Sequence, residues 1–174
     1  MLLSSLTGTS TIKIHFWNLA AYVGGRLVGG WVDLDECEDF DDFRAKVAEA
    51  TNNAEELILG DRESDFGIDF WDYVSLDTVW DTHEKLCEIE EDNREAFGDY
   101  LAHVGGTDQL DYALRTFQDR YHGCHKSIED FAWDYAESAY PELASCPPGF
   151  RIEVDTVAWE CDFWISDNGH VFSS

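Results

Sequence analysis

Basic residues are scarce in this sequence, and several other features that would assign a class are missing. The 174-residue chain has 11 lysines and arginines against 37 aspartates and glutamates. No stretch approaches 18 uninterrupted apolar residues, so we expect no membrane-spanning helix. Residues 1–10 carry no basic side chain and only a short apolar stretch, which predicts that they are not a secretory signal peptide.

Cysteines are few, odd in number and widely spaced. The five lie at positions 37, 87, 124, 146 and 161, and none forms a CxxC pair. This usage favours a reduced, cytoplasmic protein with buried thiols over a disulfide framework.

Motifs for nucleotide binding and for common hydrolase chemistry are also missing. The sequence contains no GxSxG, no phosphate-binding loop and no GxGxxG. With 37 acidic residues some carboxylates must lie close together, so a paired-carboxylate hydrolase stays a minor alternative. We predict that the chain is not an enzyme and has no catalytic residue and no cofactor.

Three segments begin like metal sites and then depart from the pattern. Residues 33–38 start like a calcium-binding EF-hand loop, but Glu38 stands where the sharp turn needs glycine. His83 begins a zinc-protease helix, yet Cys87 replaces the second histidine. Residues 122–125 hold two histidines and a cysteine at a spacing too tight for a usual zinc site, so the last turn of a helix is the favoured interpretation. No metal site is predicted.

Aromatic residues are plentiful, with 7 Trp, 7 Tyr and 11 Phe. Disordered acidic chains are poor in aromatics, so this chain is predicted to fold despite a net charge of −26. The charge is uneven: residues 33–99 hold 24 acidic and 5 basic side chains, whereas residues 1–32 hold no acid. Solubility alone needs a net charge of only about 2–8, so the excess points to a partner. A salt-adapted proteome and cation binding are the alternatives.

The first 64 residues read as a small α+β lobe. Apolar residues alternate with polar ones over residues 12–16, which predicts a strand. After Gly24-Gly25 a second strand is expected within residues 27–34, interrupted by Gly29-Gly30. Asp39 is a good N-cap for a helix that Asn52-Asn53 ends, and residues 57–59 predict a third strand.

The sequence predicts helices in the centre of the chain and strands again near the C-terminus. Ser75, Asp92, Thr107 and Ser127 are each expected to begin a helix, with Glu95 completing a capping box after Asp92. Gly105-Gly106, Gly123 and Pro141 are expected to end three of them. After Pro147-Pro148, residues 163–165 and 170–172 flank a Ser-Asp-Asn-Gly segment that predicts a hairpin.

The first central helix carries an unusual row of acids. Asp77, Asp81, Glu84 and Glu88 fall at i, i+4, i+7 and i+11, and Lys85 is the only base among them. Neighbours on such a stripe lie about 5–6 Å apart, where like charges repel. An ordinary solvated face is the simpler interpretation, but we favour a row of fixed charges that imitates the phosphates of a DNA strand.

The size of the charge is consistent with DNA mimicry. Duplex DNA carries one charge per roughly 1.7 Å of axis, so 26 net charges match about 44 Å, or about 13 base pairs. Lysines and arginines that normally neutralise phosphates would meet carboxylates instead. The chain itself is not expected to bind nucleic acid. A chaperone-like or sequestering module for another basic DNA-binding protein is the alternative function.

Three stretches resemble the ArdA antirestriction family. The first runs from Phe16 to Tyr22 and continues through Gly25, Leu27, Gly30, Trp31 and Asp33. The second runs from Glu95 to Leu101. The third comprises residues 117–121 and 127–132. Their order carries the resemblance, which extends from about residue 12 to the end.

The resemblance implies a fold, a partner and an assembly. It implies an elongated α+β homodimer with a small N-terminal α+β domain, a central helical domain and a C-terminal α+β domain. We place these at residues 1–64, 65–106 and 107–174. It also implies a DNA mimic from a mobile element or phage that inhibits type I restriction–modification enzymes, through their DNA-binding subunits, in the bacterial cytoplasm.

Two sets of residues are predicted to form the interaction sites. The dimer contact is expected at Phe131, Trp133 and Tyr135 in the less acidic C-terminal third. The partner-binding surface is expected at Asp33, Asp35, Glu36, Glu38, Asp39, Asp61, Glu63, Asp65, Asp69, Asp72, Asp77, Asp81, Glu84, Glu88, Glu91, Asp92, Glu95 and Asp99.

Overall fold

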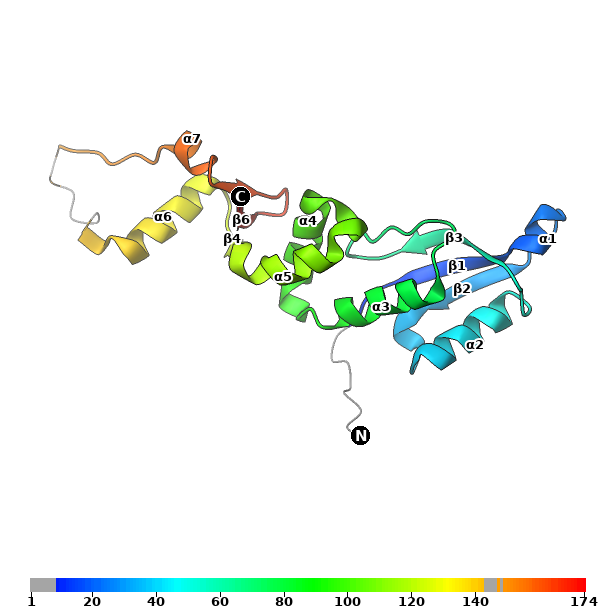
Figure 1. The fold of residues 1–174 in the computed structure, drawn as a ribbon. Helices are drawn as coiled ribbons and strands as arrows, with labels where there is room; N and C mark the ends of the chain where they lie inside the picture. The colour runs from blue at the N-terminus through cyan, green and yellow to red at the C-terminus, as the bar shows by residue number, and fades with distance from the viewer. Residues whose placement is uncertain (1–8, 143–146, 148) are drawn as a thin grey trace. The chain divides into compact units, whose positions relative to one another are not determined.

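The protein is a mixture of helices and small antiparallel sheets, which confirms the α+β class. The computed structural model describes residues 9–142, 147 and 149–174 (Figure 1). The chain divides into two compact units, residues 1–110 and 111–174. Within the described residues, no helix is long and apolar enough to cross a membrane. The three-domain division at residues 64/65 and 106/107 stays a prediction.

The first unit begins with a three-stranded antiparallel sheet of order β2-β1-β3. Its strands are β1 (Lys13–Asn18), β2 (Gly29–Asp33) and β3 (Leu57–Glu63). The short helix α1 (Leu19–Val23) follows β1, the 3-10 turn η1 (Leu34–Glu36) follows β2, and helix α2 (Phe40–Ala50) precedes β3. The alternation of residues 12–16 correctly predicted β1, because Ile12, Ile14 and Phe16 are all buried.

Helix α2 covers the apolar face of this sheet. The rings of Phe16 and Phe43 lie 6.1 Å apart, so strand and helix meet in the core. Asp39 caps α2 by accepting a hydrogen bond from the Asp42 amide, as predicted. Asn52 and Asn53 both adopt positive φ, which ends the helix where the sequence indicated.

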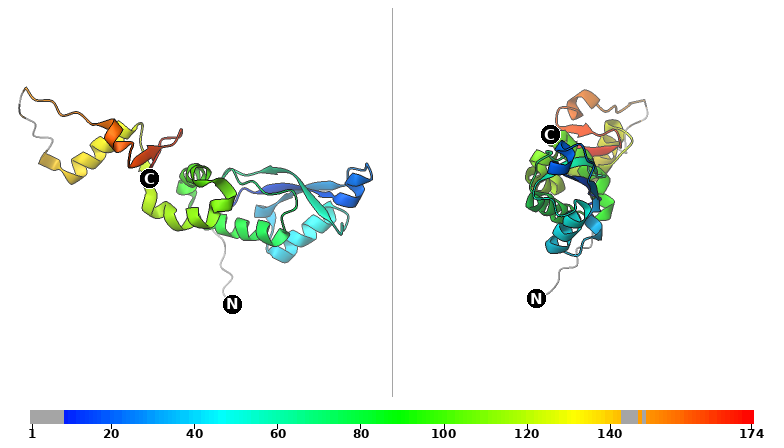
Figure 2. Two further views of the ribbon diagram at one scale, coloured as in Figure 1. Left: turned by 45° about the horizontal axis from the view of Figure 1, so that its top comes forward. Right: turned by 90° about the vertical axis from the view of Figure 1, so that its right-hand side faces the viewer.

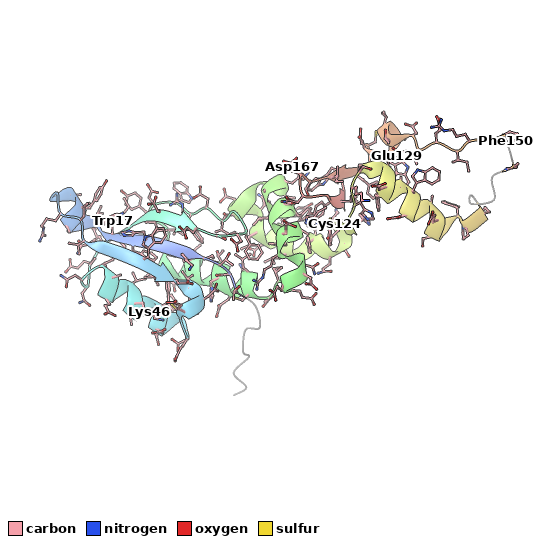
Figure 3. The ribbon with its side chains drawn as sticks, turned by 180° about the vertical axis from the view of Figure 1, so that it is seen from behind. Trp17, Lys46, Cys124, Glu129, Phe150 and Asp167 are labelled. Atoms are coloured by element: carbon pink, nitrogen blue, oxygen red, sulfur yellow. The ribbon has the colours of Figure 1, made fainter. Side chains whose placement is uncertain are left out.

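The opposite face of the sheet carries Trp17, which is half-buried (Figure 3). The glycines of the neighbouring strands make room for its indole. A Cβ at Gly60 would lie 2.9 Å from Cδ1 of Trp17, and one at Gly29 would lie 2.8 Å from its Cε3. Gly29 therefore marks a close packing position within β2 rather than a break in the strand.

Three helical segments complete the first unit. They are α3 (Leu76–Cys87), η2 (Glu91–Asn93) leading into α4 (Arg94–Val104), and η3 (Gly106–Gln109). Ser75 caps α3 as predicted, and Trp80 of α3 stacks on Phe43 at 5.6 Å. The expected capping box of Asp92 and Glu95 is wrong. Residues 91–93 instead form a 3-10 turn that runs directly into α4, so the N-cap position falls on Asn93, which makes no side-chain capping bond.

The second unit contains α5 (Leu110–Arg120), which crosses the division, and a three-stranded sheet of order β4-β6-β5. Its other elements are β4 (Tyr121–Cys124), α6 (Ile128–Ala139), α7 (Thr156–Trp159), β5 (Phe163–Ile165) and β6 (His170–Ser173) (Figure 2). The hairpin of β5 and β6 and the Ser127 cap of α6 were both predicted correctly.

One expectation for this unit is wrong. Residues 121–124 were expected to end a helix near Gly123, but they form strand β4. Tyr121 pairs with Phe172 of β6, and its ring stacks on Phe117 at 5.3 Å. Pairing with a strand almost fifty residues away overrides the helical pattern. Pro148 and Cys146 lie outside the described residues.

Candidate partner-binding surface

The predicted acidic surface is exposed almost throughout. Of the eighteen residues proposed from the sequence, all but Asp33 and Asp99 are exposed, and those two are half-buried. All eighteen belong to the first unit, where they lie on the strand ends, the connecting loops and the outer faces of α3 and α4. Exposed carboxylates are therefore distributed over several elements of this unit.

Helix α3 shows how the sequence builds this surface. Val79, Trp80 and Leu86 are buried against the core. The acidic stripe of Asp77, Asp81, Glu84 and Glu88 is exposed along the helix, as its spacing predicted. Lys85 lies 2.6 Å from a carboxylate oxygen of Asp81, so one charge of the stripe is partly neutralised.

Several of the predicted residues also have structural tasks. Asp33 faces Lys13 across the sheet at 2.8 Å. The carboxylate of Asp35 accepts hydrogen bonds from the amides of Ser10 and Thr11. Asp39 caps α2, as described above. These carboxylates are fixed in place, which orders parts of the surface before a partner arrives.

Ion pairs between strand β3 and the loop that follows it hold two more of the predicted carboxylates. Arg62 of β3 forms ion pairs with Asp69 and Asp72 in the segment that leads to α3. The sequence did not indicate this pairing, because residues seven and ten positions apart meet here through the path of a loop.

Further exposed acids were missed by the sequence interpretation. On α6, Asp130, Asp134 and Glu137 lie at i, i+4 and i+7 and are exposed, which repeats the spacing seen on α3. That spacing was the signal that could have found them. Asp134 lies 3.2 Å from Nδ1 of His125. On α2, Asp41 and Glu49 are also exposed.

The basic residues of α2 are held by neighbouring acids. Lys46 lies 2.9 Å from Asp42, one turn earlier on the helix (Figure 3 labels Lys46). The hydrogen bond from Lys46 lowers the pKa of Asp42, and the same contact raises the pKa of Lys46. Both groups therefore stay charged at neutral pH, and the lysine cancels one charge of the surface.

The residues predicted for the dimer contact differ in accessibility. Phe131 is 5% exposed and belongs to the core of the second unit, with Ile128 and Val171. Trp133 is half-buried, and Tyr135 is 48% exposed. A contact through this helix would therefore be made by Tyr135 and Trp133, with Phe131 supporting α6 from beneath. The dimer contact stays a prediction.

Among the described residues, one group of side chains could hold a metal ion. A carboxylate oxygen of Asp35, a ring nitrogen of His83 and Sγ of Cys87 lie within 4.8 Å of one another. Burial raises the pKa of the Cys87 thiol to about 11, and Nδ1 of His83 lies 2.7 Å from the Ser10 hydroxyl. His83 and Cys87 are buried and Asp35 is exposed, so these groups form a polar network at the edge of the core.

Buried thiols were expected, but only one of the four described cysteines fits. Cys87 is buried, Cys37 is half-buried, and Cys124 and Cys161 are exposed. All four are free thiols. The expectation failed for Cys124 because its segment forms an edge of the small second sheet instead of an inward-facing helix turn.

Comparison with known protein families shows to which family the chain belongs. The sequence model of the family described as Antirestriction protein (ArdA) matches residues 14–174, which is nearly the whole chain. The protein belongs to the ArdA antirestriction family. No curated protein sequence matches it. As an ArdA protein, it counters restriction and interacts with restriction enzymes.

Proposed function

We propose that this ArdA protein imitates the charge pattern of duplex DNA and occupies the DNA-binding site of a type I restriction–modification enzyme. The observation that supports this most is the exposed carboxylate surface of the first unit, in which α3 and its C-cap residue Glu88 present four acids on one stripe. A helix gains nothing from stacking like charges at about 5–6 Å. A partner with a row of lysines and arginines does gain from it.

The mechanism is competition. A DNA-binding enzyme places Lys and Arg side chains to neutralise phosphates, and the same side chains bind fixed carboxylates through charge-assisted hydrogen bonds. Long-range attraction also speeds the encounter of oppositely charged surfaces. No bond is made or broken, so the proposed function needs no catalytic group, cofactor or metal. Because DNA carries the same sign of charge, the protein competes with DNA and does not bind it.

A homodimer would double the length of duplex DNA whose charge the protein imitates. One chain carries 26 net negative charges, equivalent to about 44 Å of duplex at one charge per roughly 1.7 Å. Two chains would present about 26 base pairs of charge, which suits a large enzyme that handles DNA. We place this activity in the bacterial cytoplasm, where such enzymes act on incoming DNA from mobile elements.

A cleavage assay tests the proposal. A purified type I enzyme is incubated with substrate DNA and increasing concentrations of the protein, and the titration is repeated with competitor DNA that lacks the recognition site. Competitive mimicry predicts that more competitor DNA shifts the inhibition curve, since both ligands seek one site. Inhibition that DNA leaves unchanged would instead favour sequestration of the enzyme through another surface.

A further inference from the structure

We infer that an open hollow beside Trp71 and Tyr73 binds an arginine side chain of the partner protein. The inference rests on the proposed function only in taking the partner to be an arginine-bearing DNA-binding protein. The hollow has a volume of about 620 Å³ and is lined by Arg62, Asp69, Trp71, Asp72, Tyr73 and Asp108, among others. It lies entirely within the first unit, between the loop after β3 and the turn η3.

The loop is built so that two aromatic rings face solvent. Phe66, Ile68 and Phe70 are 2%, 6% and 5% exposed, so every second residue is anchored in the core. Trp71 directly follows the buried Phe70 and is 79% exposed. Tyr73 lies in the turn that follows and is 69% exposed.

Backbone and side-chain hydrogen bonds hold this loop at three points. The Asp69 amide donates to Oγ1 of Thr107 in η3 at 2.8 Å. The Leu59 amide of β3 donates to the carbonyl of Asp72 at 2.8 Å, and the Val74 amide closes a turn on the carbonyl of Trp71. The two rings therefore stand on a fixed support, and little ordering is needed when a partner binds.

The charges of the residues that line the hollow determine which kind of ligand it can bind. Three aspartates line it, Asp69, Asp72 and Asp108, against the single cation Arg62. Arg62 pairs with both Asp69 and Asp72 and so orients them. Their side chains nevertheless stay 77% and 58% exposed, which leaves carboxylate surface for an incoming cation.

An arginine matches this combination better than a purely apolar or a purely charged ligand. Its planar guanidinium stacks on aromatic faces and pairs with carboxylates at its edge. Trp and Tyr are also the residues most often found at the energetic centre of protein interfaces. The volume of about 620 Å³ gives an arginine side chain room to lie in the open hollow against the two rings.

The test measures peptide binding without any restriction enzyme. The probe is an N-acetylated (Arg-Gly)5 amide, and its neutral counterpart replaces each arginine by citrulline. Isothermal titration compares the wild-type protein with the Trp71→Ala, Tyr73→Ala double variant. A matched control is Phe150→Ala, since Phe150 is 76% exposed and lies in the second unit (Figure 3). Circular dichroism confirms that each variant is folded.

We expect the double variant to bind the arginine peptide about 3- to 30-fold more weakly, from the range measured for cation–π contacts. Phe150→Ala should bind like the wild type, and the citrulline peptide should not distinguish the proteins. A Trp71→Leu variant keeps apolar area without the aromatic face, so it should lose affinity as well. The inference is overturned if the double variant binds like the wild type, or if Trp71→Leu retains full affinity.

The peptide result and the restriction assay can fail separately. Weak inhibition of a type I enzyme with a normal peptide difference would reject the proposed target and leave the arginine site standing. Normal inhibition with no peptide difference would reject the arginine site and leave DNA mimicry standing.

Discussion

The hydroxyl of Ser10 lies 2.7 Å from Nδ1 of His83, which joins residues 73 positions apart in a buried contact. Ser10 is fully buried and His83 is 3% exposed. Asp35 lies beside both residues. Its carboxylate accepts a hydrogen bond from the Ser10 amide, and one of its oxygens lies 3.7 Å from Nδ1 of His83. The segment before β1 is thereby fastened to η1 and α3.

This contact predicts a pH dependence of stability. Burial lowers the pKa of His83, although Asp35, Glu84 and Asp33 oppose the shift. The unfolded chain therefore takes up the proton first as the pH falls. Neutral His83 contributes stability that is fully present above the unfolded pKa of about 6.5 and is lost as the pH falls toward the lowered folded value.

The measurement compares free energies of unfolding in urea between pH 7.5 and 5.5. The wild type should lose stability relative to His83→Gln over this range, with a slope of at most about 1.4 kcal/mol per pH unit for one proton. Carboxylates common to both proteins cancel in the difference. Parallel curves would mean that His83 titrates alike in the folded and unfolded chain.

Thiol reactivity should separate the cysteines. Thiolate is the reactive form, and burial raises the pKa of Cys87 to about 11, whereas Cys124 and Cys161 are exposed. At pH 8, iodoacetamide should modify Cys124 and Cys161 in the native protein while Cys87 stays protected until urea is added. Peptide mass mapping over time reads this out. Equal rates for Cys87 and Cys161 in native protein would contradict the burial of α3 against η1.

Local signals explain which parts of the fold were predictable. Asp39, Ser75 and Ser127 each supply a side-chain oxygen to an amide three residues on, and such caps depend only on neighbouring residues. The alternation of residues 12–16 likewise depends only on which face is buried. Strand β4 was missed because its structure comes from pairing with β6, and no local pattern encodes that partner.

The candidate surface was predictable in outline for a similar reason. A helix with a buried apolar stripe must expose the opposite side, so the exposure of Asp77 and Glu84 follows from spacing alone. The pairing of Arg62 with Asp69 and the exposure of Trp71 do not follow, because both depend on the path of a loop. Trp71 would ordinarily be assigned to the core on composition.

The cap of α2 offers a test that separates helix capping from charge. Asp39→Ala removes the acceptor for the Asp42 amide and should lower the free energy of unfolding by about 1 kcal/mol. Asp39→Asn keeps an acceptor oxygen and removes the charge, so it should stay close to the wild type. Urea unfolding of the three proteins measures both effects. Equal losses for Ala and Asn would show that the charge at the helix start, not the cap, stabilises α2.

Salt should raise the stability of the free protein and weaken its binding to the restriction enzyme. Screening weakens repulsion among exposed carboxylates, so the melting temperature should rise from low to moderate sodium chloride. Inhibition of the restriction enzyme should weaken over the same range, since salt competes for a charge-matched interface. Differential scanning calorimetry and the cleavage assay follow the two trends. A falling melting temperature would contradict an uncompensated acidic surface.

The acidic stripe of α3 should contribute to inhibition as a sum of small parts. Each exposed ion pair is worth roughly 0.2–1 kcal/mol, which corresponds to about 1.4- to 5-fold in potency. Asp77→Asn, Glu84→Gln and Glu88→Gln should each weaken inhibition within that range. Asp81→Asn should have the smallest effect of the four, because Lys85 already lies 2.6 Å from this carboxylate.

Two further variants test this prediction. One combines all four substitutions, and the other removes the positive charge of Lys85. The quadruple variant should weaken inhibition progressively, by roughly the product of the single effects, because each exposed carboxylate makes its own small contribution to a charge-matched interface. Its circular dichroism should be unchanged and its melting temperature close to that of the wild type, because the relief of like-charge repulsion along α3 offsets the loss of the ion pair between Asp81 and Lys85. Lys85→Gln should strengthen inhibition slightly by uncovering Asp81. A single variant that abolishes inhibition while its neighbours do nothing would reveal one discrete site and exclude a distributed charge array.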